Sequence, residues 1–224
     1  SDINLSIPNG KVTAIVGASG SGKTTLVKLL LGFYEPLKGS IQVGRVNLNQ
    51  CNLAWWRGQC GAVMQEGYLF SDTIARNIAI SDDEPNIERI RYAARVANIA
   101  DYIEALPLAY NTMIGQDGQG ISQGQRQRIL IARVVYKNPM FVFLDEATNA
   151  LDTNNERVIT ESLSDFYRGK TVVVVAHRLS TVRNADQIVV LDEGRSVEIG
   201  THEELTNKRG KYFALVKNQL ELGN

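Results

Sequence analysis

Residues 17–24 spell GASGSGKT, which fits the pattern G-x-x-x-x-G-K-[ST] and follows the predicted strand 11–16. Gly17, Gly20 and Gly22 allow this loop to curl so that its backbone N–H groups face inward. The Leu-rich segment that follows is predicted to be a helix, and its positive end adds to the same anion site. A triphosphate is the ligand that this arrangement favours.

Two side chains of the loop can act directly on such a ligand. Lys23 would neutralise the β and γ phosphates, and the Thr24 hydroxyl would ligate Mg²⁺. The alternative is a glycine-rich turn that carries an unrelated lysine. The order of strand, loop and helix favours the phosphate site.

Two adjacent carboxylates end another apolar run. Asp145 and Glu146 follow Phe-Val-Phe-Leu at 141–144, and neighbouring side chains on a strand point in different directions. Asp145 suits the metal, whereas Glu146 suits the attacking water as a general base, a role worth about 10²- to 10⁴-fold in rate. Two carboxylates that merely cap the next segment are the alternative.

Further polar candidates stand where elements are expected to begin or end. Ser122 and Gln125 match the capping box S-x-x-Q, which explains both residues without a ligand, although a capped helix terminus still binds anions. His177 follows the apolar run 172–175 and is placed to hydrogen-bond a γ-phosphate. The amide oxygen of Gln65 could reach Mg²⁺ or the water, and an ordinary loop amide is the alternative.

The elements that must position these residues predict an α/β fold. Short apolar runs alternate with helical stretches, a pattern typical of a mainly parallel sheet covered on both faces. Residues 41–48 predict a short antiparallel side sheet around a turn at Gly44. Strand signals vanish over about 72–136, which predicts a helical sub-domain inserted into a core of 1–71 and 137–224. The core strands are expected at 12–16, 141–144, 172–175 and 188–191.

Composition excludes several classes of protein. Lys plus Arg (24) equals Asp plus Glu (24), so no global field favours nucleic acid. Cys51 and Cys60 are the only cysteines and lack metal-ligand spacing, which predicts reduced thiols. The apolar runs are far shorter than the about 18 residues of a membrane span. Because the sequence starts without Met or a signal peptide, we expect it to be a fragment of a longer chain.

Taken in order, these motifs resemble the nucleotide-binding domain of an ATP-binding cassette (ABC) transporter, and the resemblance covers nearly the whole chain. It implies a single P-loop NTPase domain over 1–224 that binds ATP and Mg²⁺ and hydrolyses ATP, with Glu146, His177 and Lys23 as catalytic residues. The implied nucleotide site comprises Gly17, Ser19, Gly20, Ser21, Gly22, Lys23, Thr24, Thr25 and Gln65. The implied metal ligands are Thr24, Gln65 and Asp145.

The family works as a head-to-tail dimer, in which each ATP lies between one subunit's phosphate loop and the other subunit's signature. By resemblance, Ile121–Gln125 is the signature and Ala150–Asp152 is the D-loop. The family signature is usually Leu-Ser-Gly-Gly-Gln, so Ile121 and Gln123 depart from it. We expect Gln123 to tune the closed dimer without inactivating it. The residues implied to act on the partner's ATP are Ser122, Gln123, Gly124, Gln125 and Asp152.

The segment 67–78, GYLFSDTIARNI, resembles the exporter branch, where it meets coupling helices of a transmembrane domain on the same polypeptide. Tyr68, Leu69 and Phe70 would then form an exposed apolar partner surface, with core packing as the alternative. The resemblance implies a homodimer at the cytoplasmic face of a bacterial inner membrane, without a nucleic-acid partner. Asn149 and the Gln-rich signature resemble the corresponding sequence of bacterial exporters of peptides or bacteriocins.

Two rival functions use the same fold. Cassettes also serve DNA repair, chromosome maintenance and translation, but those usually carry long coiled coils or tandem cassettes. A degenerate cassette would bind ATP to stabilise a complex without hydrolysing it. The presence of Lys23, Glu146 and His177 argues against the degenerate cassette, whereas Gln123 favours it.

Overall fold

The computed structural model describes residues 3–80, 82–115, 120–176 and 179–222. By its internal contacts the chain divides into two units. The first comprises residues 1–60, 140–146 and 169–224, and the second comprises 61–139 and 147–168. Each unit has its own apolar core, which includes Ile15 and Val189 in the first and Ile103 and Ile129 in the second.

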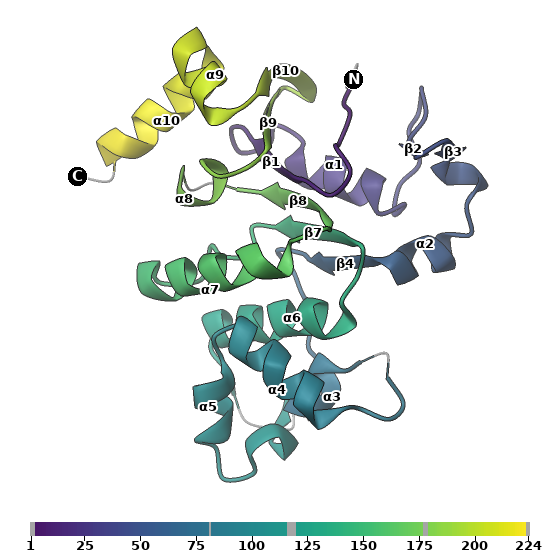
Figure 1. Cartoon of the computed structure of the whole chain (residues 1–224), viewed down its shortest axis with the longest axis vertical. Helices are drawn as coiled ribbons and strands as arrows, with labels where there is room; N and C mark the ends of the chain where they lie inside the picture. Colours follow the sequence, from purple (N-terminus) through teal and green to yellow (C-terminus); the bar gives the residue numbers. More distant parts are fainter. Residues whose placement is uncertain (1–2, 81, 116–119, 177–178, 223–224) are drawn as a thin grey trace. The chain divides into compact units, whose positions relative to one another are not determined.

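The first unit is built on strands in the order β10-β9-β1-β8-β7, of which only β10 runs antiparallel to its neighbour (Figure 1). The parallel strands confirm the four predicted apolar runs and the mainly parallel sheet. Strand β10 was not predicted, because its residues do not form an apolar run and Val197 and Ile199 remain partly exposed. The strands are β1 (Val12–Val16), β7 (Phe141–Asp145), β8 (Thr171–Val175), β9 (Gln187–Asp192) and β10 (Arg195–Gly200).

Helix α1 packs against β7 and β8 in the first unit, burying Leu26 and Val27. The predicted side sheet is confirmed as an antiparallel pair, β2 (Gln42–Val43) and β3 (Val46–Asn47). Figure 1 shows α9 beside β10, and α10 packs against α9. The helices of this unit are α1 (Lys23–Leu30), η1 (Leu48–Gln50), α2 (Leu53–Gln59), α8 (Leu179–Val182), α9 (His202–Lys208) and α10 (Lys211–Leu222).

The second unit is mainly helical, with α6 packed against α3 and α4, and α7 against α4. Within the predicted helical region, α4 begins after Asn86, whose side chain accepts a hydrogen bond from the Arg89 N–H. The paired strands β5 and β6 are two residues each, too short to give a sequence signal. The elements are β4 (Cys60–Val63), β5 (Asp72–Thr73), α3 (Ile74–Ile78), α4 (Ile87–Val96), α5 (Ala100–Glu104), η2 (Ala109–Asn111), β6 (Met113–Ile114), α6 (Gln123–Lys137) and α7 (Thr153–Phe166).

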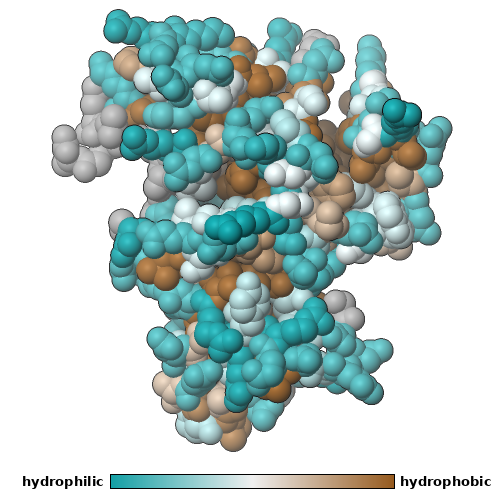
Figure 2. Space-filling model, in the orientation of Figure 1, coloured by the Kyte–Doolittle hydropathy of each residue, from teal (hydrophilic) through white to brown (hydrophobic). Residues whose placement is uncertain are grey.

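The face drawn in Figure 2 is mostly hydrophilic, with hydrophobic residues showing between the polar ones. Such mixing is ordinary, because polar residues are too few to cover a folded chain completely. No helix within the described part of the chain is both long enough and apolar enough to cross a bilayer.

One buried amide organises the segment 70–73, which leads into α3. The side chain of Asn77 is 1% exposed, accepts a hydrogen bond from the Phe70 N–H at 2.8 Å, and donates to the carbonyls of Phe70 and Thr73, both at 3.0 Å. The Nε of Arg133, on α6, donates to the backbone carbonyl of Asn77 at 2.8 Å. A buried donor or acceptor without a partner is costly, so this amide fixes the path of the chain around it.

Replacing Asn77 should therefore destabilise the folded chain. We expect Asn77→Ala to lower the free energy of unfolding by about 2–4 kcal/mol, because several partly buried backbone groups lose their partner at once and the buried side chain leaves a cavity. Denaturant unfolding measures this change. Asn154→Ala, at an exposed position on α7, is the matched control and should stay within about 0.5 kcal/mol of the parent chain. Equal stability of the two variants would contradict the role of Asn77.

Candidate functional site

The phosphate loop joins the end of β1 to the start of α1, as the sequence predicts. Gly17 has φ +153°, and a Cβ there would lie 2.2 Å from the carbonyl oxygen of Leu191, so only glycine fits. Gly22 has φ +99° and serves as the N-cap of α1 without a side-chain hydrogen bond. The first N–H groups of α1 are therefore directed toward the loop without a side-chain cap, which is the arrangement that binds phosphate.

Lys23 is 6% exposed and folds back over the loop. Its Nζ donates to the carbonyls of Gly17 at 2.9 Å and Ala18 at 2.8 Å. Burial lowers the pKa of Lys23, whereas the carboxylates of Glu146 and Asp145 act in the opposite direction. The loop thus holds a buried ammonium close to two carboxylates, all within the first unit.

The other loop residues differ in their exposure. Ser19, Gly20 and Thr25 are exposed, whereas Ser21 is 4% exposed. The Oγ of Ser21 makes no hydrogen bond within the described structure and is one of few such buried atoms. A buried hydroxyl without a partner at this place fits a loop that is completed by a polar ligand.

Asp145 ends β7 and is 0% exposed. Neither of its carboxylate oxygens has a hydrogen-bond partner among the described residues. Burial raises the pKa of Asp145; the nearby Thr24 hydroxyl lowers it, although it makes no well-formed bond to either oxygen. A buried carboxylate beside a hydroxyl is a donor set that suits Mg²⁺, which prefers oxygen ligands.

Glu146 stands immediately after Asp145 with φ +54°, a left-handed conformation that is costly for a residue with a side chain. Its N–H donates to the carbonyl of Val175, on the neighbouring strand, at 3.3 Å. The side chain is half-buried. The strained backbone turns this carboxylate away from the course of β7. The sequence gives no sign of this turn, because glutamate, unlike glycine or asparagine, does not favour a left-handed conformation.

The signature begins α6 in the second unit. Ser122 is its N-cap, and the predicted capping box is confirmed: Ser122 Oγ accepts from the Gln125 N–H, and Gln125 Oε1 accepts from the Ser122 N–H at 2.8 Å. Ser122 and Gln123 are exposed. In the same unit a cavity of about 340 Å³ is lined by Gln65, Gln123 and Arg126 together with Met64, Glu66, Gly67, Gln127 and Leu130.

The D-loop also lies in the second unit and leads directly into α7. Asp152 is the N-cap of α7, and its Oδ1 accepts from the Asn155 N–H at 3.0 Å. Two hydrogen bonds to Asn155 are the main reasons that the pKa of Asp152 is lowered. Arg128 and Gln127, which sequence reasoning missed, bond to the backbone of the signature and the D-loop. Their spacing from Gly124 along one helix face was the signal available.

The structure brings part of the predicted site together. Lys23, Thr24, Asp145 and Glu146 meet in the first unit, whereas Gln65, the signature and the D-loop belong to the second. His177 lies outside the described residues, so its predicted contact with phosphate stays a prediction.

The charge state of Asp145 should be visible in stability. Because its folded pKa is raised above the ordinary 3.8, the folded chain binds this proton more tightly than the unfolded chain does. The resulting penalty is present above the folded pKa and disappears as the pH falls below 3.8. We expect Asp145→Asn to raise the free energy of unfolding at pH 7, without nucleotide, by about 1–2 kcal/mol, and to raise it little near pH 3. The exposed control Asp83→Asn should show no such gain, and destabilisation by Asp145→Asn at pH 7 would refute the expectation.

Comparison with known proteins places this chain among ABC proteins. The family model described as ABC transporter matches residues 1–149. ABC transporter B family member 2 of Dictyostelium discoideum is 47% identical over 217 residues, which cover 97% of this chain and 16% of that protein. ATP-binding cassette sub-family B member 10, mitochondrial, of Mus musculus is 46% identical, with 97% of this chain and 31% of that protein covered.

A bacterial relative and a solved structure also belong to the ABC proteins. The Toxin RTX-III translocation ATP-binding protein of Actinobacillus pleuropneumoniae is 45% identical, covering 98% of this chain and 31% of that protein. A bacterial Atm1-family ABC exporter with ATP bound has a TM-score of 0.91 and 39% identity, covering 94% of this chain and 37% of that one. This sequence thus spans well under half of these relatives. The chain belongs to the ABC transporter family and is an ATP-binding, ATPase domain of its exporter branch.

Proposed function

We propose that this domain hydrolyses ATP in a head-to-tail dimer and thereby powers export by transmembrane domains. One observation supports the proposal most: buried Lys23 and buried Asp145, together with strained Glu146, lie close enough for their charges to interact. A buried carboxylate without a hydrogen-bond partner is costly, and both oxygens of Asp145 lack one among the described residues. Mg²⁺ would compensate the charge of Asp145, and the phosphates of ATP would compensate that of Lys23.

Each predicted site residue has a defined part in this proposal. The loop N–H groups and Lys23 would hold the phosphates, while Thr24 and Asp145, with Gln65 as the predicted third ligand, would hold Mg²⁺. The metal supplies neutralisation of phosphate charge. Glu146 would accept a proton from water as its oxygen attacks the γ-phosphorus and the bond to the β-phosphate oxygen breaks. ADP and inorganic phosphate are the products, with His177 proposed to contact the γ-phosphate.

The proposal requires a second copy of the domain. Ser122, Gln123, Gly124, Gln125 and Asp152 are proposed to face the partner's ATP, with homodimerisation as the simplest arrangement. Ser122 and Gln123 are exposed at the N-terminus of the 15-residue helix α6, and exposed N–H groups and hydroxyls at such an end attract phosphate. Gln123 would then add an amide contact where the family usually has no side chain.

The segment 67–78 is proposed to dock the coupling helices. Tyr68 is 64% exposed and Phe70 is 48% exposed, and their rings pack edge to face with centroids 5.1 Å apart. Leu69 was predicted to share this surface but is 6% exposed and belongs to the core. The guanidinium of Arg133 donates a hydrogen bond to the backbone carbonyl of Tyr68 at 3.1 Å, which fixes the backbone of the segment. Two exposed aromatic rings on a fixed backbone suit an apolar partner.

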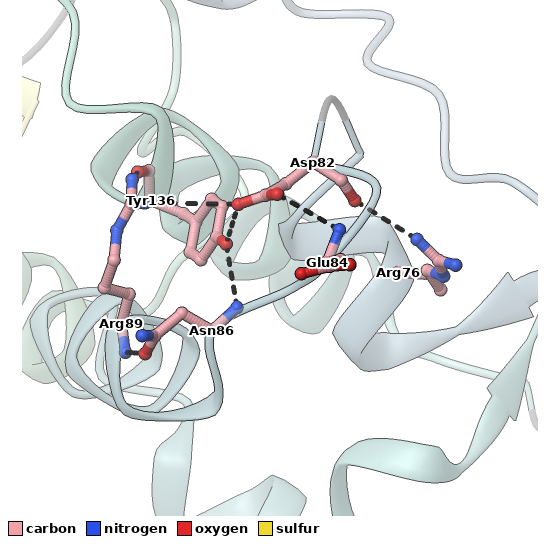
Figure 3. Close-up of polar contacts among 6 residues, drawn as sticks. All are labelled: Arg76, Asp82, Glu84, Asn86, Arg89 and Tyr136. Carbon is pink, nitrogen blue, oxygen red and sulfur yellow. Dashed lines mark hydrogen bonds and ion pairs between the residues drawn. The ribbon is translucent and has the colours of Figure 1, made fainter.

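The loop after this segment is fixed to α6 by a second group of contacts (Figure 3). The hydroxyl of Tyr136 donates to the carboxylate of Asp82 at 2.5 Å and accepts from the Asn86 N–H at 3.1 Å. The Arg89 guanidinium lies 4.4 Å from the centroid of the Tyr136 ring and donates to the Tyr136 carbonyl. Burial and the bond to Asp82 raise the pKa of Tyr136, so the hydroxyl remains a donor at neutral pH.

Several broader assignments belong to the same proposal. We propose a single ABC ATPase domain over 1–224 with a helical sub-domain at about 72–136. We further propose transmembrane domains on the same polypeptide, a place on the cytoplasmic face of a bacterial inner membrane, and peptides or other amphipathic molecules as substrates. The name of the relative from Actinobacillus pleuropneumoniae, a toxin translocation ATP-binding protein, supports a bacterial exporter.

Two substitutions test the hydrolytic proposal. Glu146→Gln should keep ATP binding and lower the hydrolysis rate by about 10²-fold or more, because the base is lost while the phosphate loop stays intact. The ATP-bound dimer should accumulate, which light scattering detects. Lys23→Ala should lose ATP binding instead. A Glu146→Gln chain that hydrolyses ATP at the parent rate would remove Glu146 from its proposed role.

A third substitution tests how firmly the segment 82–86 is held against α6. Tyr136→Phe removes one hydroxyl and keeps the ring beside Arg89, so we expect a loss of about 1–2 kcal/mol in the free energy of unfolding. Amide hydrogen exchange in 82–86 should accelerate by about tenfold. Tyr92→Phe, on the exposed side of α4, is the control and should change neither quantity. Unchanged exchange in Tyr136→Phe would show that the hydroxyl does not fix the loop.

A further inference from the structure

The signature and the D-loop of the same chain lie against each other inside the second unit. A Cβ on Gly124 would stand 3.2 Å from the carbonyl oxygen of Ala150 and 3.6 Å from the Leu151 side chain. One turn along α6, Gln127 Oε1 accepts a hydrogen bond from the Ala150 N–H at 3.1 Å. The D-loop backbone is therefore in contact with the helix that starts at the signature.

Arg128 extends this contact on the same helix. Its guanidinium donates to the carbonyl of Gly124 at 3.4 Å and to that of Asn98 at 2.6 Å. A further bond of 3.5 Å reaches Oδ1 of Asn155. The side chain is half-buried, and hydrogen bonds from a charged donor in such a place are stronger than neutral ones. Arg128 thus joins the signature, the α4–α5 corner and the first turn of α7.

Asn155 carries the contact on to the D-loop. Its backbone N–H and its Nδ2 donate to the two carboxylate oxygens of Asp152, at 3.0 and 2.5 Å. Its Oδ1 accepts from Nδ2 of Asn98 at 2.8 Å. Asn98 has φ +51°, a left-handed conformation that asparagine tolerates better than most residues. An N-cap for α7 needs only the bond from the Asn155 N–H, so the remaining bonds need another explanation.

We propose that Asn98, Gln127, Arg128 and Asn155 form a clamp that positions the D-loop relative to the signature. These four residues are called the D-loop clamp below. The inference rests on the proposed function, in which both elements face the ATP of the same partner chain. With the clamp closed, one rigid surface presents the signature and Asp152 together, so closure on the partner's phosphate also sets the D-loop. The four are positioning residues, since none of them is assigned a contact with ATP.

The clamp predicts that binding and turnover respond differently to its parts. Arg128 touches Gly124 directly, so its loss disturbs the signature and the D-loop together. Asn155 reaches the signature only indirectly, through Arg128, so its loss leaves the bond from Arg128 to Gly124 and the capping box in place. A 1 Å misplacement of a group at a reacting site can cost about 10²-fold in rate. Loss of Asn155 should thus lower turnover more than it lowers ATP-dependent dimerisation.

The variants are chosen to spare the fold. Asn155→Ala and Arg128→Gln each open the clamp. Asn98→Gly removes one side-chain bond but keeps both the left-handed backbone and the carbonyl that accepts from Arg128. Arg157→Gln is the matched control, because Arg157 is an exposed arginine on α7 that pairs with Glu161. Arg128→Lys keeps the charge and should restore part of what Arg128→Gln loses.

The first measurement is independent of activity. Amide hydrogen exchange of the segment 147–156, without nucleotide, should accelerate by about tenfold in Arg128→Gln and Asn155→Ala and stay unchanged in Arg157→Gln. Unchanged exchange in both clamp variants overturns the clamp, whether or not the domain hydrolyses ATP. A parent chain that neither dimerises nor hydrolyses ATP instead overturns the proposed function, and with it the role of the clamp in turnover.

The second measurement separates turnover from binding. In Asn155→Ala, kcat should fall about 10- to 100-fold, while the ATP concentration for half-maximal dimerisation in a Glu146→Gln background should change less than about threefold. Asn98→Gly should lie between Asn155→Ala and the parent. A parent-like kcat in Asn155→Ala, or an equal loss of dimerisation and turnover, overturns the positioning role.

Discussion

The burial of unlike charges at the carboxyl edge of the first unit's sheet is the constraint on which the rest depends. Lys23 and Asp145 are both nearly inaccessible to water, and burial shifts the pKa of each toward its neutral form. A fold optimised for stability alone would avoid this arrangement. Glu146, held in a left-handed conformation, adds strain at the same edge. The costs are understandable as preparation for a charged ligand and its metal.

Much of the fold and of this site could be predicted because the signals are local. The phosphate loop needs glycines at fixed positions, and the apolar runs of parallel strands are continuous, so Gly17 and 172–175 were recognisable. The same holds for the capping box at Ser122. Strand β10 was not predicted because its residues alternate in exposure and do not form a continuous apolar run.

The contacts that could not be predicted join residues far apart in the chain. Asn77, Tyr136, Arg128 and Asn155 are ordinary polar residues in the sequence, and only packing shows which backbone groups they satisfy. All four lie on α6 or form hydrogen bonds with it. The first half of α6 contacts the D-loop, and its second half bonds to the backbone of Tyr68, Asn77 and Asn86. A helix is stiff over 15 residues. The proposed ATP contact lies at the start of α6, and the proposed docking segment is bonded to its second half, so one rigid helix connects the two.

The dependence of ATP hydrolysis on chain concentration tests the central claim most directly, namely that a second copy completes the site. With Mg²⁺ and saturating ATP, the rate per chain should rise with concentration below the dissociation constant of the dimer and then reach a plateau. Sedimentation under the same conditions should place the dimer at the plateau. A rate per chain that is constant while the chain remains monomeric would contradict the account, because one chain would then hold a complete site.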